Sequence, residues 1–468
     1  MFPYVEQTRL EQQHLLDEIQ TWVNQWKQQD QVRQYTTQLE ALEAFFSRTI
    51  ELIQRQFETV RQETDTRKLY RLSQEFEERL LWLRRAWEFF KEKFDQRNAP
   101  ETKDILKAAD EVVWSCFHPA LQCVFPQKQD QPPSPLAFIE SEFSPAAFPL
   151  EMVPPSLRSG LRNGDAEAAL RQCINKLPIP LVRIPPACIR SPWLLIFLGH
   201  EVGHQVQYAV KPNLGFVNEF QTGLETLVSN HQPPTSLCWK KWSQEIFADA
   251  YSVACMGRLA GHALSELIYG PPEVLVKRDG GMYPPTIVRL KLIQAFSDKL
   301  NLPNPQPNFP ALNFDQIDTT PIQSDLDMIP TVVDFLSTSL PGLNQSLQSL
   351  TGFNHQFFER NEPVDTYRRN LLQPTRLAPL KNDILQARWL TCAGYAAWLN
   401  LVESFDPSRF DQDRKNMAEK LCQALQVCGP EGTRAAGDTP SKQIIEQSQA
   451  IGDEVGSILD RLLQEQSL

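Results

Sequence analysis

Residues 193–209 read WLLIFLGHEVGHQVQYA and place His200, Glu201 and His204 inside a mostly apolar run. Residues four apart in a helix lie on one face, about one turn from each other. Both histidines can therefore turn a ring nitrogen toward one metal ion. Glu201 is rotated from His200 by about 100° and flanks that ion, where the general base for an activated water would stand. Pro192 suits the first turn of a helix. Together with the apolar run and the spacing of the histidines, it predicts a buried helix that carries a metal site.

Residues 245–249 read EIFAD and supply a second half to this site. A catalytic zinc ion takes three protein ligands and keeps one position open. Glu245 offers the third ligand from a second helix, predicted from Trp242 to about Leu259. Asp249 lies one turn further along the same face, where it can accept a hydrogen bond from the other ring nitrogen of a zinc-bound histidine. Two carboxylates on an apolar helix face need such partners, because their unpaired burial is costly.

His-Glu-x-x-His followed by Glu-x-x-Ala-Asp resembles the gluzincins, that is, thermolysin and its relatives. With the later Pro-Pro-x-x-x-Arg, the wording is most similar to the CAAX-prenyl and heat-shock-type membrane peptidases, over roughly residues 175–295. The resemblance implies a zincin-like core that hydrolyses peptide bonds. It makes Glu201 the general base and Asp249 the residue that orients a zinc ligand. The implied zinc ligands are His200, His204 and Glu245.

The chain departs from that family at Tyr283, which stands before Pro284 and Pro285 where the similar peptidases carry a histidine. The family histidine acts as a donor in the transition state, and Tyr283 is expected to offer its phenol to the developing oxyanion. An ordinary turn aromatic is the alternative. Arg289 is expected to pair with a buried carboxylate or with a carboxylate of the substrate, and a solvated or structural arginine is its alternative.

Residues 177–186, LPIPLVRIPP, are the best strand candidate. Leu181 and Arg183 are expected to face one side, and Val182 and Ile184 the other. Prolines at both ends predict a strand at a sheet edge. Such an edge would hold an extended peptide by main-chain pairing, and an ordinary edge strand is the alternative.

Apolar residues repeat at three- and four-residue spacing through the first hundred positions. This pattern predicts three long helices in a hairpin or bundle, followed by a connecting helix near 103–116. The bundle is expected either to dock a partner protein or to be a structural element that packs on the catalytic part of the chain. Proline-rich stretches at 126–156 and 303–322 are typical of linkers, and helices return beyond about 330. We expect a mainly α fold with a zincin-like core and a small edge β-sheet, divided into an N-terminal bundle (1–125), a metallopeptidase core (126–300) and a C-terminal helical region (301–468).

The net charge of −11 argues against a general nucleic-acid binder and against a protein that binds anionic membrane surfaces. No stretch reaches the 18 or so apolar residues of a membrane span, and the first residues lack the pattern of a signal peptide. Nine cysteines without a Cys-x-x-Cys pair are typical of reduced thiols. A cytoplasmic location without membrane contact is therefore expected, unlike the similar peptidases.

These patterns together predict a zinc-dependent peptidase that acts on a peptide or protein. A non-catalytic helical adaptor with a structural zinc site is the main alternative, although such a site has no need of Glu201 as a base. A zinc hydrolase of amides or small acyl groups is another. The choice between endopeptidase and aminopeptidase stays open, because no motif that would anchor a free amino terminus is found.

Overall fold

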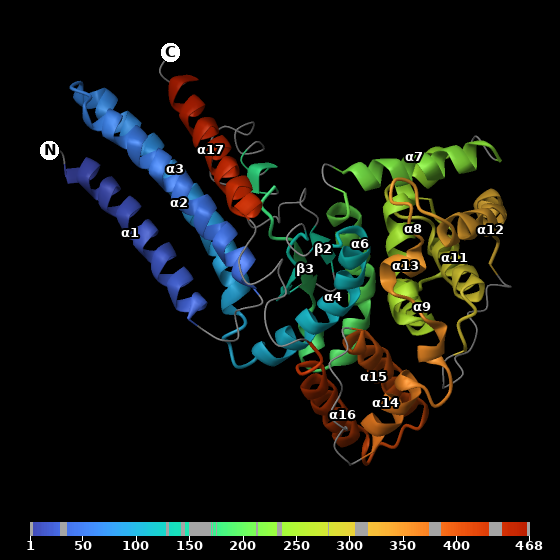
Figure 1. The fold of residues 1–468 in the computed structure, drawn as a ribbon. Helices are drawn as coiled ribbons and strands as arrows, with labels where there is room; N and C mark the ends of the chain where they lie inside the picture. The colour runs from blue at the N-terminus through green and yellow to red at the C-terminus, as the bar shows by residue number, and fades with distance from the viewer. Residues whose placement is uncertain are drawn as a thin grey trace.

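The computed structural model describes residues 3–28, 35–127, 131–141, 146–148, 170, 172–174, 176–211, 214–231, 236–278, 280–304, 317–373, 385–429 and 442–465. Much of the two proline-rich stretches that the sequence marks as linkers lies outside these ranges. Helices dominate the described chain, which confirms the mainly α prediction (Figure 1). Among the described residues, no helix has both the length and the apolar character that a membrane crossing needs.

The first three helices are the long ones that the apolar spacing predicts: α1 (Pro3–Lys27), α2 (Thr36–Arg61) and α3 (Thr66–Asp95). Asp65 begins α3 by accepting a hydrogen bond from the Lys68 amide at 2.8 Å. The last helix, α17 (Lys442–Glu465), packs along α2 and shares the apolar core of α1–α3 (Figure 1). Four long helices among the described residues therefore share this core, and the fourth of them comes from the far end of the sequence.

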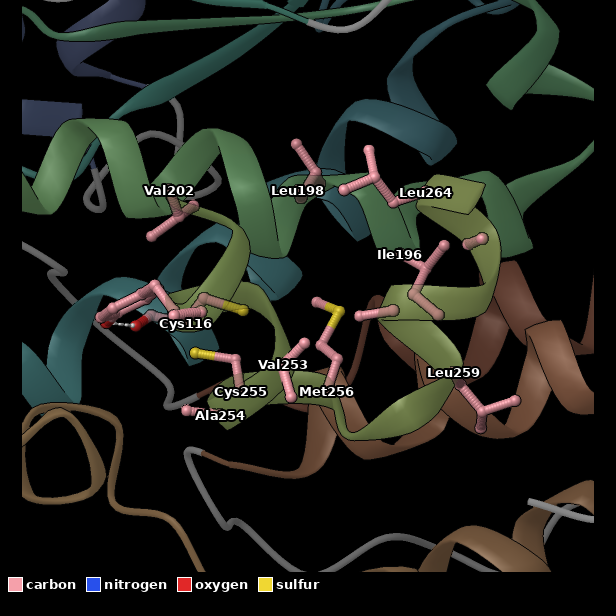
Figure 2. Close-up of a cluster of buried hydrophobic side chains, with 14 of the residues drawn as sticks. Cys116, Ile196, Leu198, Val202, Val253, Ala254, Cys255, Met256, Leu259 and Leu264 are labelled. Atoms are coloured by element: carbon pink, nitrogen blue, oxygen red, sulfur yellow. Dashed lines mark hydrogen bonds between the residues drawn. The ribbon is translucent and has the colours of Figure 1, made fainter. Parts of the chain in front are cut away.

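A second and larger apolar core is built around α4 (Lys103–Val124), which is buried along most of its length. Figure 2 shows part of this core, where apolar side chains of α4 meet those of α6 (Leu198–Ala209), α8 (Ser236–Met256) and α9 (Arg258–Ile268). The other helices follow in chain order: η4 (Pro186–Ile189), η5 (Pro192–Phe197), α6 (Leu198–Ala209), α7 (Gly215–Ser229), α8 (Ser236–Met256), α9 (Arg258–Ile268), α10 (Pro272–Leu275), α11 (Thr286–Lys299), η7 (Thr320–Ile322), α12 (Gln323–Ser337), α13 (Leu347–Thr351), η8 (His355–Phe358), α14 (Pro363–Leu372), α15 (Gln386–Glu403) and α16 (Phe410–Leu425).

Three short strands form one sheet: β1 (Leu136–Ile139), β2 (Ala146–Phe148) and β3 (Leu181–Ile184). Their order is β1-β3-β2, with β3 parallel to β1 and antiparallel to β2. The prediction that β3 is an edge strand is therefore wrong. Pro180 and Pro185 flank the four strand residues and replace none of them, so neither proline removes a ladder hydrogen bond from within the strand.

The sheet stands between the two apolar cores. Leu136 and Phe138 of β1 and Leu181 of β3 belong to the core of the helical bundle. Val182 and Ile184, which point the opposite way along β3, belong to the larger core. The predicted alternation of β3 is thus correct. One face of the strand packs in the core of the helical bundle and the other face packs in the larger core.

Side chains, rather than a further strand, satisfy part of the outer edge of β1. Gln96 brackets Ile139, accepting from its amide at 2.8 Å and donating to its carbonyl at 2.9 Å. Asp110 accepts from the Ala137 amide at 3.2 Å, and Arg97 donates to the Ala137 carbonyl at 2.6 Å. These contacts blunt the edge and fasten α3 and α4 to the sheet.

Candidate metal centre

The helix that carries the two histidines starts later than the sequence predicts. The apolar run from Trp193 forms the 3₁₀ helix η5, and the α-helical part, α6, begins only at Leu198. Pro192 does occupy the first position of η5. The second predicted helix is α8, which ends at Met256 because Gly257 adopts a left-handed φ of 70°.

His200, His204 and Glu245 come together with their ligand atoms within 4.8 Å of one another. The Nε2 atoms of His200 and His204 lie 3.1 Å apart. Glu245 places Oε2 3.5 Å from Nε2 of His200 and Oε1 3.3 Å from Nε2 of His204. Two helices therefore aim two nitrogens and a carboxylate at one point, and these three side chains could hold a metal ion.

Two glycines let α6 and α8 approach closely enough for this arrangement. A Cβ atom on Gly203 would stand 2.9 Å from Cα of Ala248, and one on Gly199 would stand 2.9 Å from Oγ of Ser252. Gly199 and Gly203 are four residues apart and so share the face of α6 that packs on α8. The sequence interpretation missed this role, although the Gly-x-x-x-Gly spacing of Gly199 and Gly203, each directly before a histidine, was a visible signal of close packing.

Asp249 lies one turn beyond Glu245 and contacts the other side of His200. Its Oδ1 is 2.9 Å from Nδ1 of His200, while Nε2 of the same ring faces the other two ligand candidates. Arg289, from α11, donates from Nε and Nη2 to the two oxygens of Asp249 at 2.8 Å each. Nη2 of Arg289 also lies 3.2 Å from Oε2 of Glu245. Arg289 therefore pairs with buried carboxylates, which was one of the alternatives expected from the sequence.

These contacts set the charge state of the cluster. Burial alone would raise the pKa of Glu245, but the two histidines outweigh it and hold the pKa well below its usual value. Burial would also raise the pKa of Asp249, which Arg289 nevertheless lowers. Burial lowers the pKa of His200, yet Asp249 and Glu245 raise it to about 10. A raised pKa means that the His200 ring holds a proton more tightly, and a metal ion at Nε2 would compete with that proton.

Glu201 and Tyr283 stand at different depths beside this cluster. Glu201 is buried on α6 directly after His200, at 8% exposure. Tyr283 precedes α11 and is 53% exposed, with its ring centre 5.9 Å from Cζ of Arg289. The phenol is thus connected to the cluster through Arg289 rather than buried within it.

Leu181 and Arg183 have partners of their own. The Leu181 carbonyl accepts a hydrogen bond from Nε2 of Gln205 at 2.9 Å, which ties α6 to the sheet. Nη1 of Arg183 lies 3.4 Å from Oε2 of Glu140. Because β3 is paired on both sides, its main chain does not offer the open edge that peptide pairing requires.

No protein-family model, curated protein or solved structure matches this chain.

Proposed function

We propose that the chain is a zinc-dependent peptidase of the cytoplasm, which hydrolyses peptide bonds in a peptide or protein substrate. The observation that carries the proposal is the spacing of the three ligand atoms. A tetrahedral zinc ion with bonds of about 2.0–2.1 Å keeps its ligand atoms about 3.3 Å apart. The Nε2 atoms of His200 and His204 lie 3.1 Å apart, and the two oxygens of Glu245 approach one of these nitrogens each, at 3.5 Å (Oε2 to His200) and 3.3 Å (Oε1 to His204). Each of these separations is close to that value.

The donor set also fits a catalytic rather than a closed site. Three protein ligands leave a fourth position for water or substrate, whereas structural zinc sites take four protein ligands. A zinc ion held there supplies Lewis-acid chemistry, lowering the pKa of water to about 7 and polarising the scissile carbonyl. Asp249 supports this by fixing the ring orientation of His200, since its Oδ1 contacts the nitrogen that faces away from the ligands.

Glu201 is proposed as the general base. It stands next to His200 on α6 and is buried, so its carboxylate acts in a site where water is restricted. It accepts the proton of the attacking water and then delivers it to the leaving amine. Tyr283 is proposed to donate its phenolic proton in a hydrogen bond to the oxyanion, and its exposure lets it reach a substrate at the mouth of the site.

The strand that would hold an extended substrate is proposed to be β2 in place of β3. Among the described residues, β2 ends the β1-β3-β2 order, and it packs against α6, the helix of the two histidines. A peptide paired along β2 would thus run beside the metal centre. Leu181 and Arg183 are proposed to act indirectly, because they belong to β3, the strand on which β2 is paired.

The test compares the wild type with Glu201→Gln on a peptide library, together with zinc analysis of both proteins. Loss of the base is expected to lower turnover about 10²–10⁴-fold while one zinc ion per chain is retained. Glu273→Gln, an exposed glutamate on α10, is the matched control and should cleave like the wild type. A wild type that unfolds on chelation and cuts no peptide would instead indicate the adaptor with a structural zinc site.

A further inference from the structure

A cavity of about 160 Å³ lies where α9, η8, α14 and α15 meet. It is at the C-terminal end of α8, because Arg258 follows that helix, whereas Glu245 of the metal centre is near the middle of α8, eleven residues before Met256. Eleven residues correspond to about 16 Å along a helix axis. The cavity is therefore separate from the chemistry proposed above and does not depend on it.

The inner wall of the cavity is apolar. Leu259, Val364 and Ala396 line it and are nearly fully buried, and Phe358 completes the wall. Phe358 is seated directly on the backbone of Gly257, where a Cβ atom would stand 2.8 Å from the ring. Gly257 also has a φ of 70°, which favours glycine. A residue with a side chain at position 257 would occupy the space that the Phe358 ring fills.

Three arginines line the same cavity, and two of them are already engaged. Arg258 donates from Nε to the Leu302 carbonyl at 2.8 Å and from Nη2 to Asp298 at 2.5 Å. Arg368 donates to Asp365 at 2.7 Å and to Asn400 at 2.6 Å. Each of these two guanidinium groups is therefore already paired with a carboxylate, and its position is set by the fold.

Arg360 differs from the other two arginines. It is exposed, and it forms no ion pair with any residue in the described ranges of the chain. Neither of the two acids in the lining, Glu359 and Asp365, forms an ion pair with Arg360. Asp365 is bound by Arg368, which outweighs burial and lowers the pKa of Asp365, and Oε1 of Glu359 lies 3.5 Å from Nε2 of His355. A guanidinium group with five donors thus stands at the cavity without an ion pair to any acid in the described part of the chain.

We propose that this cavity binds a small carboxylate with a compact apolar body. The apolar body is buried against Leu259, Phe358 and Ala396, and the carboxylate is bound by Arg360 in the bidentate geometry that guanidinium groups prefer. The size of the cavity limits the ligand, since an engineered apolar cavity of about 150 Å³ admits benzene. A single ring or a short branched chain fits this volume.

The test uses benzoate as the probe on the full-length protein, with saturation-transfer NMR and calorimetry as readouts. Saturable binding is expected at about millimolar Kd, as suits a ligand of this size. Benzyl alcohol, which has the same ring without the charge, should bind about tenfold more weakly because the guanidinium group then gains no charged partner. The absence of saturable benzoate binding, or equal binding of the two probes, would overturn the proposal.

Two variants locate the binding. Arg360→Gln should weaken benzoate about tenfold and leave benzyl alcohol unchanged, since only the charged contact is lost. Ala396→Val, which fills the apolar wall, should weaken both probes. Arg55→Gln, an exposed arginine on α2, is the control and should bind benzoate like the wild type. Unchanged benzoate binding in Arg360→Gln would contradict the site even if Ala396→Val proved unstable, because Arg360 is exposed and its loss leaves the fold intact.

Discussion

Arg289 binds both carboxylate oxygens of Asp249, through Nε and Nη2 at 2.8 Å each. Asp249 is fully buried, and the side chain of Arg289 is only 8% exposed. Such a two-pronged pair has a defined geometry as well as a defined charge. It fixes the carboxylate that contacts His200, so α11 takes part in orienting a proposed metal ligand on α6.

Arg289→Met is expected to destabilise the fold by about 3–5 kcal/mol, because it leaves the buried Asp249 charge without its main partner. Denaturant unfolding of the metal-free protein measures this. Arg409→Met is the control, since Arg409 is 72% exposed and its one ion pair within the described ranges is with Asp413, so its loss should cost about 1 kcal/mol or less. If Arg289→Met and Arg409→Met cost the same, the pair does not hold the site.

Gly203→Ala is expected to weaken metal binding and to destabilise the fold by about 1–3 kcal/mol. The added methyl group would stand 2.9 Å from Cα of Ala248, which is backbone and can yield only if α6 and α8 move apart. The histidines and Glu245 would separate with them. A chelator competition assay gives the metal affinity. Gly270→Ala, whose nearest neighbour would be 3.8 Å away, should behave like the wild type.

His204→Ala is expected to abolish the stabilisation by zinc. If zinc binds the folded chain alone, a free concentration of about 100 times Kd adds about 2.7 kcal/mol to the wild type. Calorimetry before and after zinc is added to chelator-treated protein measures the shift in Tm. A variant that gains as much Tm as the wild type would mean that zinc binds elsewhere.

Local spacing was enough to predict the parts of the site that lie within a single helix. His200 and His204 share a face because they are four residues apart, and the same holds for Glu245 and Asp249. The three long N-terminal helices followed from their apolar stripes in the same way. Such features depend on helix geometry alone, which the sequence expresses directly.

What the sequence did not predict depends on contacts between distant segments. β3 was placed at a sheet edge, because nothing local shows that β1 and β2 would pair with its two sides. The packing of α17 on α2 joins segments about four hundred residues apart. The apolar stripe of a helix shows that it packs against something, but not which helix it packs against. The contact of Arg289 with Asp249 needed the packing of α11 on α8, which spacing along one helix cannot express.

Asp365→Asn is expected to change how stability depends on pH. Arg368 lowers the pKa of Asp365 below its usual 3.8, despite the opposing effect of burial. A carboxyl group with a depressed folded pKa stabilises the fold above its unfolded pKa, and this contribution is lost as the pH falls through the folded value. Below about pH 4 the free energy of unfolding should therefore fall more steeply for the wild type than for Asp365→Asn. Parallel pH profiles from denaturant unfolding would contradict this.

Leu459→Ala tests whether the fourth helix of the bundle stabilises the fold. Leu459 is fully buried in the core that α17 shares with α1–α3. Truncating a buried leucine leaves a cavity and costs about 2–5 kcal/mol. Leu237→Ala, at a leucine that is 65% exposed on α8, should cost far less and is the matched control. If the two variants unfold at the same denaturant concentration, the packing of α17 does not contribute to the stability of the bundle, and α1–α3 are stable without it.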